Sequence, residues 1–393
     1  MKTDHLITDR LHAIDASGIR KVFDLAAKLD DPINLSIGQP DFDVPDAIKD
    51  AACDAIRGGH NSYTQTQGIA DLRAKVAARL AAEFPDTLGG VGDNALPADT
   101  GLLITSGVSG ALMLLLMATV QPGDEVLIPD PYFVMYKHLV KLAGGTPVFV
   151  DTYPDFQVSA AKIEPLITER TKLVLFNTPS NPTGVVAMPD ACREVAELCE
   201  RRGVLLVSDE IYDEFCYEKV DVGQAEPRIP SPLRTTRNVL MLRGYSKTYA
   251  MTGWRLGYAV GPAGVVEQMT KLQQYSFVCA PSMVQLAGVL AMEVDVSAHV
   301  EAYRAKRDRV VERLSPHYEL TTPGGAFYAF PKVPESLGIT ASQFVERCVA
   351  KNLLVIPGSV FSERDTHFRL SYATTDDTLE RGLDVLVDLA TSR

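Results

Sequence analysis

The chain has 393 residues, of which 46% are hydrophobic and 22% charged, and it carries a net charge of −12 at neutral pH. This length predicts two or three domains, and the composition is ordinary for a soluble globular protein. The negative charge disfavours nucleic acid as a partner, and the longest apolar run, Ala111–Val120, is too short to span a membrane.

The N-terminal stretch MKTDHLITDRLHAIDAS is polar and lacks the apolar segment of a secretory signal. The six cysteines show no CxxC spacing. We therefore expect reduced thiols in a cytoplasmic protein, not a disulfide framework or a zinc site.

Short apolar runs alternate with helical segments between Gly101 and Gly261. Apolar runs separated by helices are typical of a buried, mostly parallel sheet in an α/β core. The expected strands are Gly101–Thr105, Glu125–Ile128, Thr146–Val150, Lys172–Phe176, Val204–Ser208, Val239–Arg243 and Leu256–Val260. Helices are expected at Gly110–Val120 and Asp190–Arg202, and loops at Asp86–Thr100 and Asp221–Arg237.

Five of these strands end in clusters of polar residues and glycines. The clusters are SGVSG, PDPYF, NTPSNPTG, DEIYD and GYSKTYAMTGWR. In open α/β sheets the ligand lies beyond the carboxyl ends of the strands. We therefore expect the five clusters to converge on one site.

The pattern changes from Pro281 onward. A long charged helix is expected near Val300–Leu314, and a further helix is expected to close the chain. Short strands are expected at Gly325–Pro331, Leu353–Ile356 and Phe368–Tyr372. These elements predict a smaller α+β domain at residues 281–393, joined by the N-terminal segment 1–45, beside a large domain at 46–280.

Lys247 is the strongest candidate for chemistry. A lone lysine is usually a solvated surface charge, but Lys247 follows a strand and lies among Tyr, Gly, Trp and Met. A lysine in such a place can form an imine with an aldehyde and then shuttle a proton. Arg255 and Ser246 lie close by in the sequence, and two cations with a hydroxyl suit a phosphate.

The segment SKTYAMTGWRLGYA resembles the lysine motif of the class I and II aminotransferases, which depend on pyridoxal 5′-phosphate (PLP) and have fold type I. NTPSNPTG, SDEIY, PDPYF, SIGQPDFDVP, NSYTQTQGIADLR and FRLSYA resemble the family's other signatures in the right order. The resemblance covers the chain from about Ser17 to about Ala373. It implies a large PLP-binding domain with a mixed, mainly parallel seven-stranded sheet and a smaller α+β domain.

The resemblance also implies roles for residues around the cofactor ring. Lys247 would be the Schiff-base lysine and general acid/base, and Asp209 would pair with the pyridine nitrogen. Tyr212 and Asn181 would hydrogen-bond the phenolic oxygen, and Asn181 would also contact the substrate. Without the resemblance, Asp209 would be interpreted as a helix N-cap and Asn181 as a turn residue.

The resemblance further implies a phosphate site and a shared active site. Phe133 would stack on the ring, although it would otherwise be interpreted as core. Tyr63 would reach the phosphate of the neighbouring subunit, which requires a homodimer. The implied phosphate contacts are the backbone amides of Gly107, Val108 and Ser109 at a helix start. Ser246, Lys247 and Arg255 complete the expected set of cofactor-binding residues.

Arg369 would bind the substrate α-carboxylate with two parallel hydrogen bonds, although a strand salt bridge is the alternative. Gly38 would contact the substrate near the domain hinge. Ser109 stands where some aspartate-using relatives carry a lysine for the distal carboxylate, which puts aspartate specificity in doubt. Arg20, in the segment SGIRK with Ser17 and Ile19, is the remaining candidate cation, although a solvated helix charge is the alternative.

The expected reaction is a ping-pong transfer of an amino group from an α-amino acid to a 2-oxo acid. One alternative is another PLP reaction on the same fold, such as a C–S β-lyase or a decarboxylating enzyme. A second is a ligand-sensing regulator with an aminotransferase-like domain and no catalysis. The segment before Ser36 is too short for a winged helix, and the net charge is negative, so the regulator is disfavoured.

Overall fold

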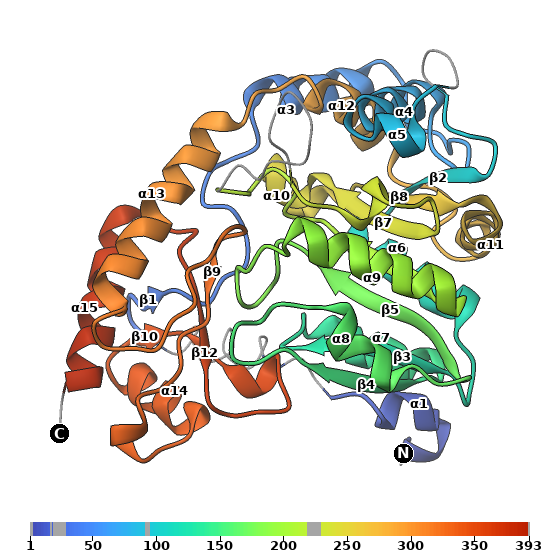
Figure 1. Ribbon diagram of the computed structural model, residues 1–393. Helices are drawn as coiled ribbons and strands as arrows, with labels where there is room; N and C mark the ends of the chain where they lie inside the picture. Colours follow the sequence, from blue (N-terminus) through green and yellow to red (C-terminus); the bar gives the residue numbers. More distant parts are fainter. Residues whose placement is uncertain (1–2, 16–17, 19–28, 91–94, 218–228, 392–393) are drawn as a thin grey trace.

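The computed structural model describes residues 3–15, 18, 29–90, 95–217 and 229–391. Its centre is a seven-stranded sheet with the strand order β2–β8–β7–β6–β5–β3–β4 (Figure 1). β8 runs antiparallel to its neighbours β2 and β7, and the other neighbouring strands are parallel. The strands are β2 Thr100–Thr105, β3 Glu125–Asp130, β4 Thr146–Asp151, β5 Thr171–Asn177, β6 Leu205–Asp209, β7 Val239–Gly244 and β8 Gly257–Pro262.

The mixed, mainly parallel seven-stranded sheet expected from the sequence is therefore confirmed. Each expected strand is present, and no strand end is displaced by more than two residues. The expected helix Asp190–Arg202 is α9, Pro189–Arg202. The start expected at Gly110 for the earlier helix is wrong, because α6 spans Gly107–Thr119 and takes the preceding glycine turn into its first turn.

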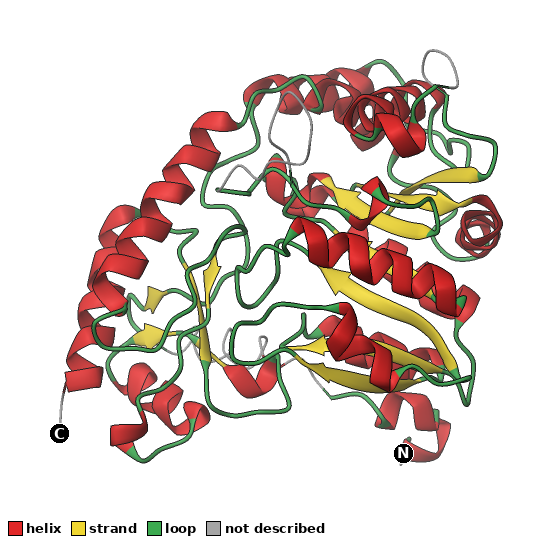
Figure 2. Ribbon diagram, in the orientation of Figure 1, coloured by secondary structure: helices red, strands yellow, loops and turns green. Residues whose placement is uncertain are grey.

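Helices cover both faces of the sheet (Figure 2). One face packs on α6, α7 (Met135–Ala143) and α11 (Ala263–Gln274), which share a core with Val207 and Leu242. We call this the front face. The opposite, or back, face packs on α9 and on α3 Asp46–Arg57, α4 Ala70–Glu83 and α12 Ser282–Ala291. Since side chains alternate across a strand, successive residues of β6 and β7 enter different cores.

A second group of elements lies to one side of the large sheet, coloured orange to red in Figure 1. β1 (Ile33–Asn34) pairs in parallel with β10 (Leu353–Leu354), so the N-terminal part of the chain joins this group. A three-stranded antiparallel sheet has the order β11–β12–β9, with β9 at Tyr328–Ala329, β11 at Ile356–Pro357 and β12 at Phe368–Ser371. Its helices are α13 Ser297–Leu314, α14 Ala341–Ala350 and α15 Asp376–Thr391.

Two expectations for this part of the chain are corrected. The strand expected at Leu353–Ile356 is two strands in different sheets, because the chain turns at the buried Val355 and β11 pairs with β12. The strand expected at Gly325–Pro331 is reduced to β9, which pairs with β12 through Tyr328 and Ala329. The expected long helix and the closing helix are α13 and α15.

The remaining described elements are short. They include a helix and a 3-10 turn inside the two expected loops, α5 and η3. Every helix in the described ranges is too short or too polar to cross a membrane. The short elements are η1 Asp4–Leu6, α1 Asp9–His12, α5 Pro85–Leu88, α8 Ala160–Ile163, η2 Glu164–Leu166, η3 Pro232–Arg234, α10 Tyr245–Thr248, η4 Thr252–Trp254, η5 Glu335–Leu337 and η6 Gly358–Val360.

The division of the chain at residues 45 and 280 stays a prediction. α12 begins just after that second limit, yet its buried side chains share the back-face core with α3 and α4. We therefore propose that the large domain extends through α12 and that the small domain begins at α13.

Candidate active site

A cavity of about 350 Å³ lies at the carboxyl ends of the parallel strands. This is the place where we expected the polar clusters at the strand ends to converge. All of the expected site residues line this cavity except Gly107 and Tyr63. Residues from β12 and from the segment after β1 close it on the other side. The lining residues are Ile37, Gly38, Gln39, Val108, Ser109, Leu112, Phe133, Met135, Tyr136, Asn177, Asn181, Asp209, Ile211, Tyr212, Ser246, Lys247, Thr252, Arg255, Tyr328 and Arg369.

Lys247 lies on the short helix α10, directly after β7. Its Nζ donates a hydrogen bond to the Gly38 carbonyl oxygen at 2.6 Å. Burial, followed by the charges of Arg369 and Arg255, lowers the pKa of Lys247 to about 8, although Asp209 acts in the opposite sense. Lowering the pKa increases the fraction of neutral amine near physiological pH, and the neutral amine is the form that attacks a carbonyl carbon.

Asp209 ends β6 and is 5% exposed. Its Oδ2 accepts a hydrogen bond from the Tyr136 hydroxyl at 2.7 Å, and its Oδ1 accepts one from the Ile211 amide at 3.2 Å. Burial raises the pKa of Asp209 to about 6, against the lowering effect of these two hydrogen bonds. A buried carboxylate with neutral donors as its partners favours the binding of a cationic group beside it.

The start of α6 forms a cradle for an anion. The Arg255 guanidinium donates to the Ser109 Oγ at 2.7 Å and to the Thr252 carbonyl oxygen at 2.9 Å. Gly107 has a φ of +68°, and a Cβ there would lie 2.6 Å from Arg255 Nη2. Glycine at this position therefore lets the guanidinium approach the first backbone amides of the helix, where an anion is also favoured by the helix dipole.

Arg369 lies on β12 and is 1% exposed. It donates to the Asn181 Oδ1 at 3.0 Å and to the Ser36 carbonyl oxygen at 2.9 Å. Its guanidinium carbon lies 4.5 Å from the ring centres of both Tyr328 and Phe361, and its Nε has no hydrogen-bond partner among the described residues. A buried guanidinium held by neutral acceptors and aromatic faces is suited to bind a carboxylate.

Tyr212 and Tyr328 join the two sides of the cavity. Their hydroxyl oxygens are 2.9 Å apart, and burial raises the pKa of Tyr212. A Cβ on Gly38 would lie 2.5 Å from the Tyr328 hydroxyl oxygen, so glycine is required for this close approach. Phe133 is half-buried and meets Tyr136 edge to face, with the ring centres 5.7 Å apart.

Two expected residues do not line the cavity. Gly107 lies behind Arg255, as described above, while Tyr63 is 84% exposed. Ser17, Ile19 and Arg20 lie outside the described residues.

Sequence reasoning missed Tyr136, Tyr328, Asn177 and Ser36. Tyr136 follows the PDPYF motif by three positions, which is the one signal that could have drawn attention to it. Tyr328 and Ser36 come from distant parts of the chain, and no local pattern relates them to Arg369.

The cavity thus combines four features that a single ligand can satisfy. The Lys247 amine matches an aldehyde, and the Asp209 carboxylate matches a protonated ring nitrogen. The cradle at Arg255 matches a phosphate, and Arg369 remains available for a carboxylate. The residues present therefore fit PLP together with an α-amino acid.

Comparison with known proteins agrees with this geometry. The family "Aminotransferase class I and II" matches residues 30–386. The chain is similar to aromatic-amino-acid aminotransferase 2 of Thermococcus litoralis and to aspartate aminotransferase of Pyrococcus abyssi, each 35% identical over 390 residues and 96% of both chains. It is also similar to the crystal structure of aspartate aminotransferase from Thermotoga maritima, with a TM-score of 0.88, 32% identity and coverage of 98% of this chain and 100% of that chain.

Proposed function

We propose which residues perform transamination in this chain, which belongs to the class I and II aminotransferases and is a PLP-dependent transaminase. The single observation that carries the assignment is the position of Lys247. Its amine, with a pKa lowered to about 8, lies in one cavity with Asp209, the anion cradle and a guanidinium without a carboxylate partner among the described residues.

Bound PLP supplies an electron-withdrawing ring that stabilises negative charge developing at the substrate Cα. The Lys247 amine would hold the cofactor through its aldehyde carbon and would move a proton at the substrate Cα. Asp209 keeps the ring nitrogen protonated, because its buried negative charge is neutralised best by that proton. Tyr212 and Asn181 donate to the phenolic oxygen.

We propose that the anion cradle at the start of α6 binds the phosphate group of the cofactor. Arg255 supplies the positive charge, while the hydroxyls of Ser109 and Ser246 and the backbone amides of Gly107 and Val108 supply hydrogen bonds.

Arg369 is proposed to bind the α-carboxylate of the substrate. The Asn181 side chain and the Ser36 carbonyl oxygen hold its guanidinium from one side, which leaves its remaining donors for the substrate. Two parallel hydrogen bonds then fix the Cα–H bond toward Lys247.

We further propose that neutral donors, such as alanine or aromatic amino acids, are preferred to aspartate. The lining residues beyond the reaction centre are largely apolar, including Ile37, Leu112 and Met135. Lys247, Arg255 and Arg369 are the cations in the described lining, and each already has a role. A buried carboxylate without a cation would cost several kcal/mol. The solved and curated relatives carry both aspartate and aromatic names, so either substrate class is compatible with the family.

A homodimer with shared active sites is proposed from the exposure of Tyr63. Tyr63 is 84% exposed in the single subunit, so its side chain is free to contact a partner subunit, as the family resemblance implies. A cytoplasmic location is proposed because all six cysteines are free.

A panel of amino donors and 2-oxo acid acceptors tests these assignments. We expect the kcat/KM for alanine or phenylalanine to exceed that for aspartate in the wild type. The same order in Arg20→Ala would show that the described lining suffices for the preference. A preference for aspartate of tenfold or more in both proteins, about 1.4 kcal/mol, would contradict the neutral-pocket proposal. Release of pyruvate and ammonia without an acceptor would instead indicate β-lyase chemistry.

A further inference from the structure

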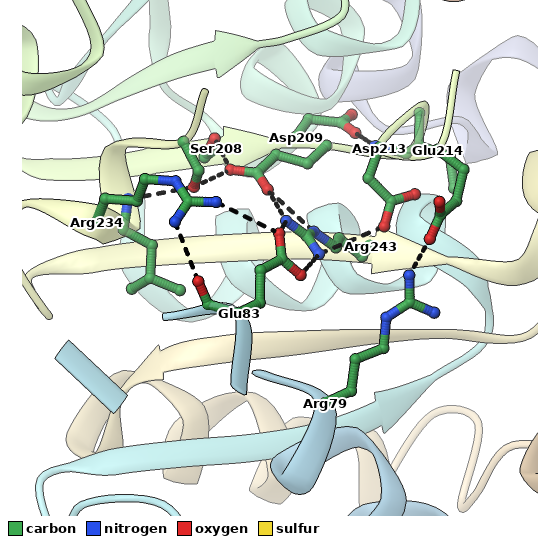
Figure 3. Close-up of polar contacts among 12 residues, drawn as sticks. Arg79, Glu83, Ser208, Asp209, Asp213, Glu214, Arg234 and Arg243 are labelled. Carbon is green, nitrogen blue, oxygen red and sulfur yellow. Dashed lines mark hydrogen bonds and ion pairs between the residues drawn. The ribbon is translucent and has the colours of Figure 1, made fainter. Parts of the chain in front are cut away.

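Four charged residues with little exposure lie together on the back face of the sheet, and Figure 3 shows three of them, Glu83, Asp213 and Arg243, with their polar contacts. They are Glu83, Glu210, Asp213 and Arg243, and we call them the back-face cluster. Arg243 donates to the Glu83 carboxylate at 2.7 and 2.8 Å and to Glu210 Oε2 at 2.8 and 3.0 Å, and its guanidinium lies 3.4 Å from Asp213. Arg243, Glu83 and Glu210 are each at most 3% exposed.

The cluster is adjacent in the chain to the residues proposed for catalysis. Glu210 directly follows Asp209, Asp213 directly follows Tyr212, and Arg243 precedes Lys247 by four positions. Since side chains alternate across a strand, Asp209 faces the cavity while Glu210 faces the back layer.

Backbone pairing continues to the ends of β6 and β7, where the Glu210 amide donates to the Leu242 carbonyl oxygen at 2.9 Å. Glu83 is the last residue of α4. Arg243 therefore connects three elements: the end of β6, the end of β7 and the end of α4.

Arg243 links the two glutamates of the cluster, because its guanidinium pairs with both carboxylates. Three carboxylates surround the Arg243 guanidinium, and burial raises the pKa of Asp213 to about 7. Glu210 Oε1 also accepts from the hydroxyls of Ser208 and Ser231. Arg234 also lies 3.9 Å from Glu83, and the charge of Arg79 acts on Asp213, but Arg243 is the cation that joins Glu83 to Glu210. Loss of Arg243 would remove that link, and repulsion between the carboxylates would move the strand ends away from α4.

We propose that Arg243 is a positioning residue for the transamination site. By binding Glu83 and Glu210 together on the back face, it holds the ends of β6 and β7 in register and so fixes the position of Lys247 relative to Asp209 on the front face. This proposal rests on the proposed roles of those two residues.

The test is a pH titration of the visible absorption of the holoenzyme, which follows protonation of the Lys247–cofactor linkage. Burial, followed by the charges of Arg369 and Arg255, lowers the pKa of the Lys247 amine. The same two cations line the cavity beside the linkage, so a displaced Lys247 should move the linkage out of part of their field. We expect Arg243→Met to raise the apparent pKa of the linkage by about 0.5 unit or more. It should also lower kcat by about tenfold with little change in KM, because Arg369 on β12 still binds the substrate.

Two further variants make the outcome decisive. Arg243→Lys keeps the positive charge but cannot form paired hydrogen bonds with both glutamates, so it should show the same shift even if Arg243→Met does not fold. Arg307→Lys changes another buried arginine, on α13, and should lose thermal stability without shifting the titration.

Wild-type titration and kcat in a destabilised Arg243→Lys protein would overturn the positioning role. Normal half-transamination by Lys247→Ala would instead refute the assignment of the lysine itself.

Discussion

Asp209 is expected to destabilise the apoenzyme in its ionised form. Burial raises the pKa of Asp209 from its ordinary value of 3.8 to about 6. Between these values the folded protein binds a proton on Asp209 that the unfolded chain has released, so stability falls as the pH rises through this window. A difference of about 2 units corresponds to about 3 kcal/mol, of which about 2 kcal/mol falls between about pH 4.5 and about pH 7.5.

The assay is urea unfolding of apo wild type and apo Asp209→Asn across this pH range at one protein concentration. Since the other titrating groups are common to both proteins, the difference in their unfolding free energies isolates Asp209. The wild type should lose about 2 kcal/mol relative to Asp209→Asn as the pH rises.

The matched control is Asp43→Asn. Its hydrogen bond with Lys49 lowers the pKa of the exposed Asp43 below its ordinary value of 3.8, so Asp43 titrates below the assay range and the difference for Asp43→Asn should be nearly independent of pH between about pH 4.5 and about pH 7.5. A difference for Asp209→Asn that is independent of pH would refute the reasoning. Added PLP should then stabilise the wild type more than Asp209→Asn, because its ring nitrogen supplies the positive charge that Asp209 lacks.

Three further predictions concern other residues of the site. Mixing Tyr63→Ala with Lys247→Ala should restore activity through heterodimers after subunit exchange; no recovery would argue against a shared site. Arg369→Lys should lower kcat/KM for α-amino acids by about 100-fold, because an ammonium cannot form two parallel hydrogen bonds with a carboxylate, and steady-state kinetics measure this loss. Gly38→Ala should lower kcat/KM by about tenfold by displacing the buried Tyr328 hydroxyl, with wild-type kinetics as the contrary result.

The seven-stranded sheet was predictable because its strands are buried on both faces. A strand such as β7 is buried at every position, and its first four residues, Val239–Leu242, form a continuous apolar run. The short strands of the second region carry no such signal. Leu353, Leu354, Val355 and Ile356 are all buried, and their sequence does not show that the chain changes sheet between them.

The residues of the site were predictable where they stand in motifs at strand ends. Asp209 ends β6 and Lys247 follows β7, so motifs close to these strands were enough to identify both residues. Tyr328 could not be found in this way, since its approach to Gly38 and Arg369 depends on how the β9–β12 sheet docks against the segment after β1. The partners of Arg243 were missed for the same reason, because Glu83 is 160 residues away in the chain.

Buried charges are paired on the back face of the sheet and unpaired in the candidate active site on the front face. On the back face, Arg243 is bound to carboxylates on several sides. On the front face, Lys247, Asp209 and Arg369 form hydrogen bonds to neutral groups, and no ion pair joins any of them to another described residue. Each of these three charges costs free energy while it is buried without a counter-charge. The ligands of a transaminase carry the complementary charges: a protonated ring nitrogen for Asp209 and a carboxylate for Arg369. The free energy that the unpaired charges cost in the apoenzyme is therefore recovered when the cofactor and substrate bind and pair with them. The ion pairs of the back-face cluster hold the ends of β6 and β7 in place, so these strand ends cannot move to reduce that cost before the ligands bind.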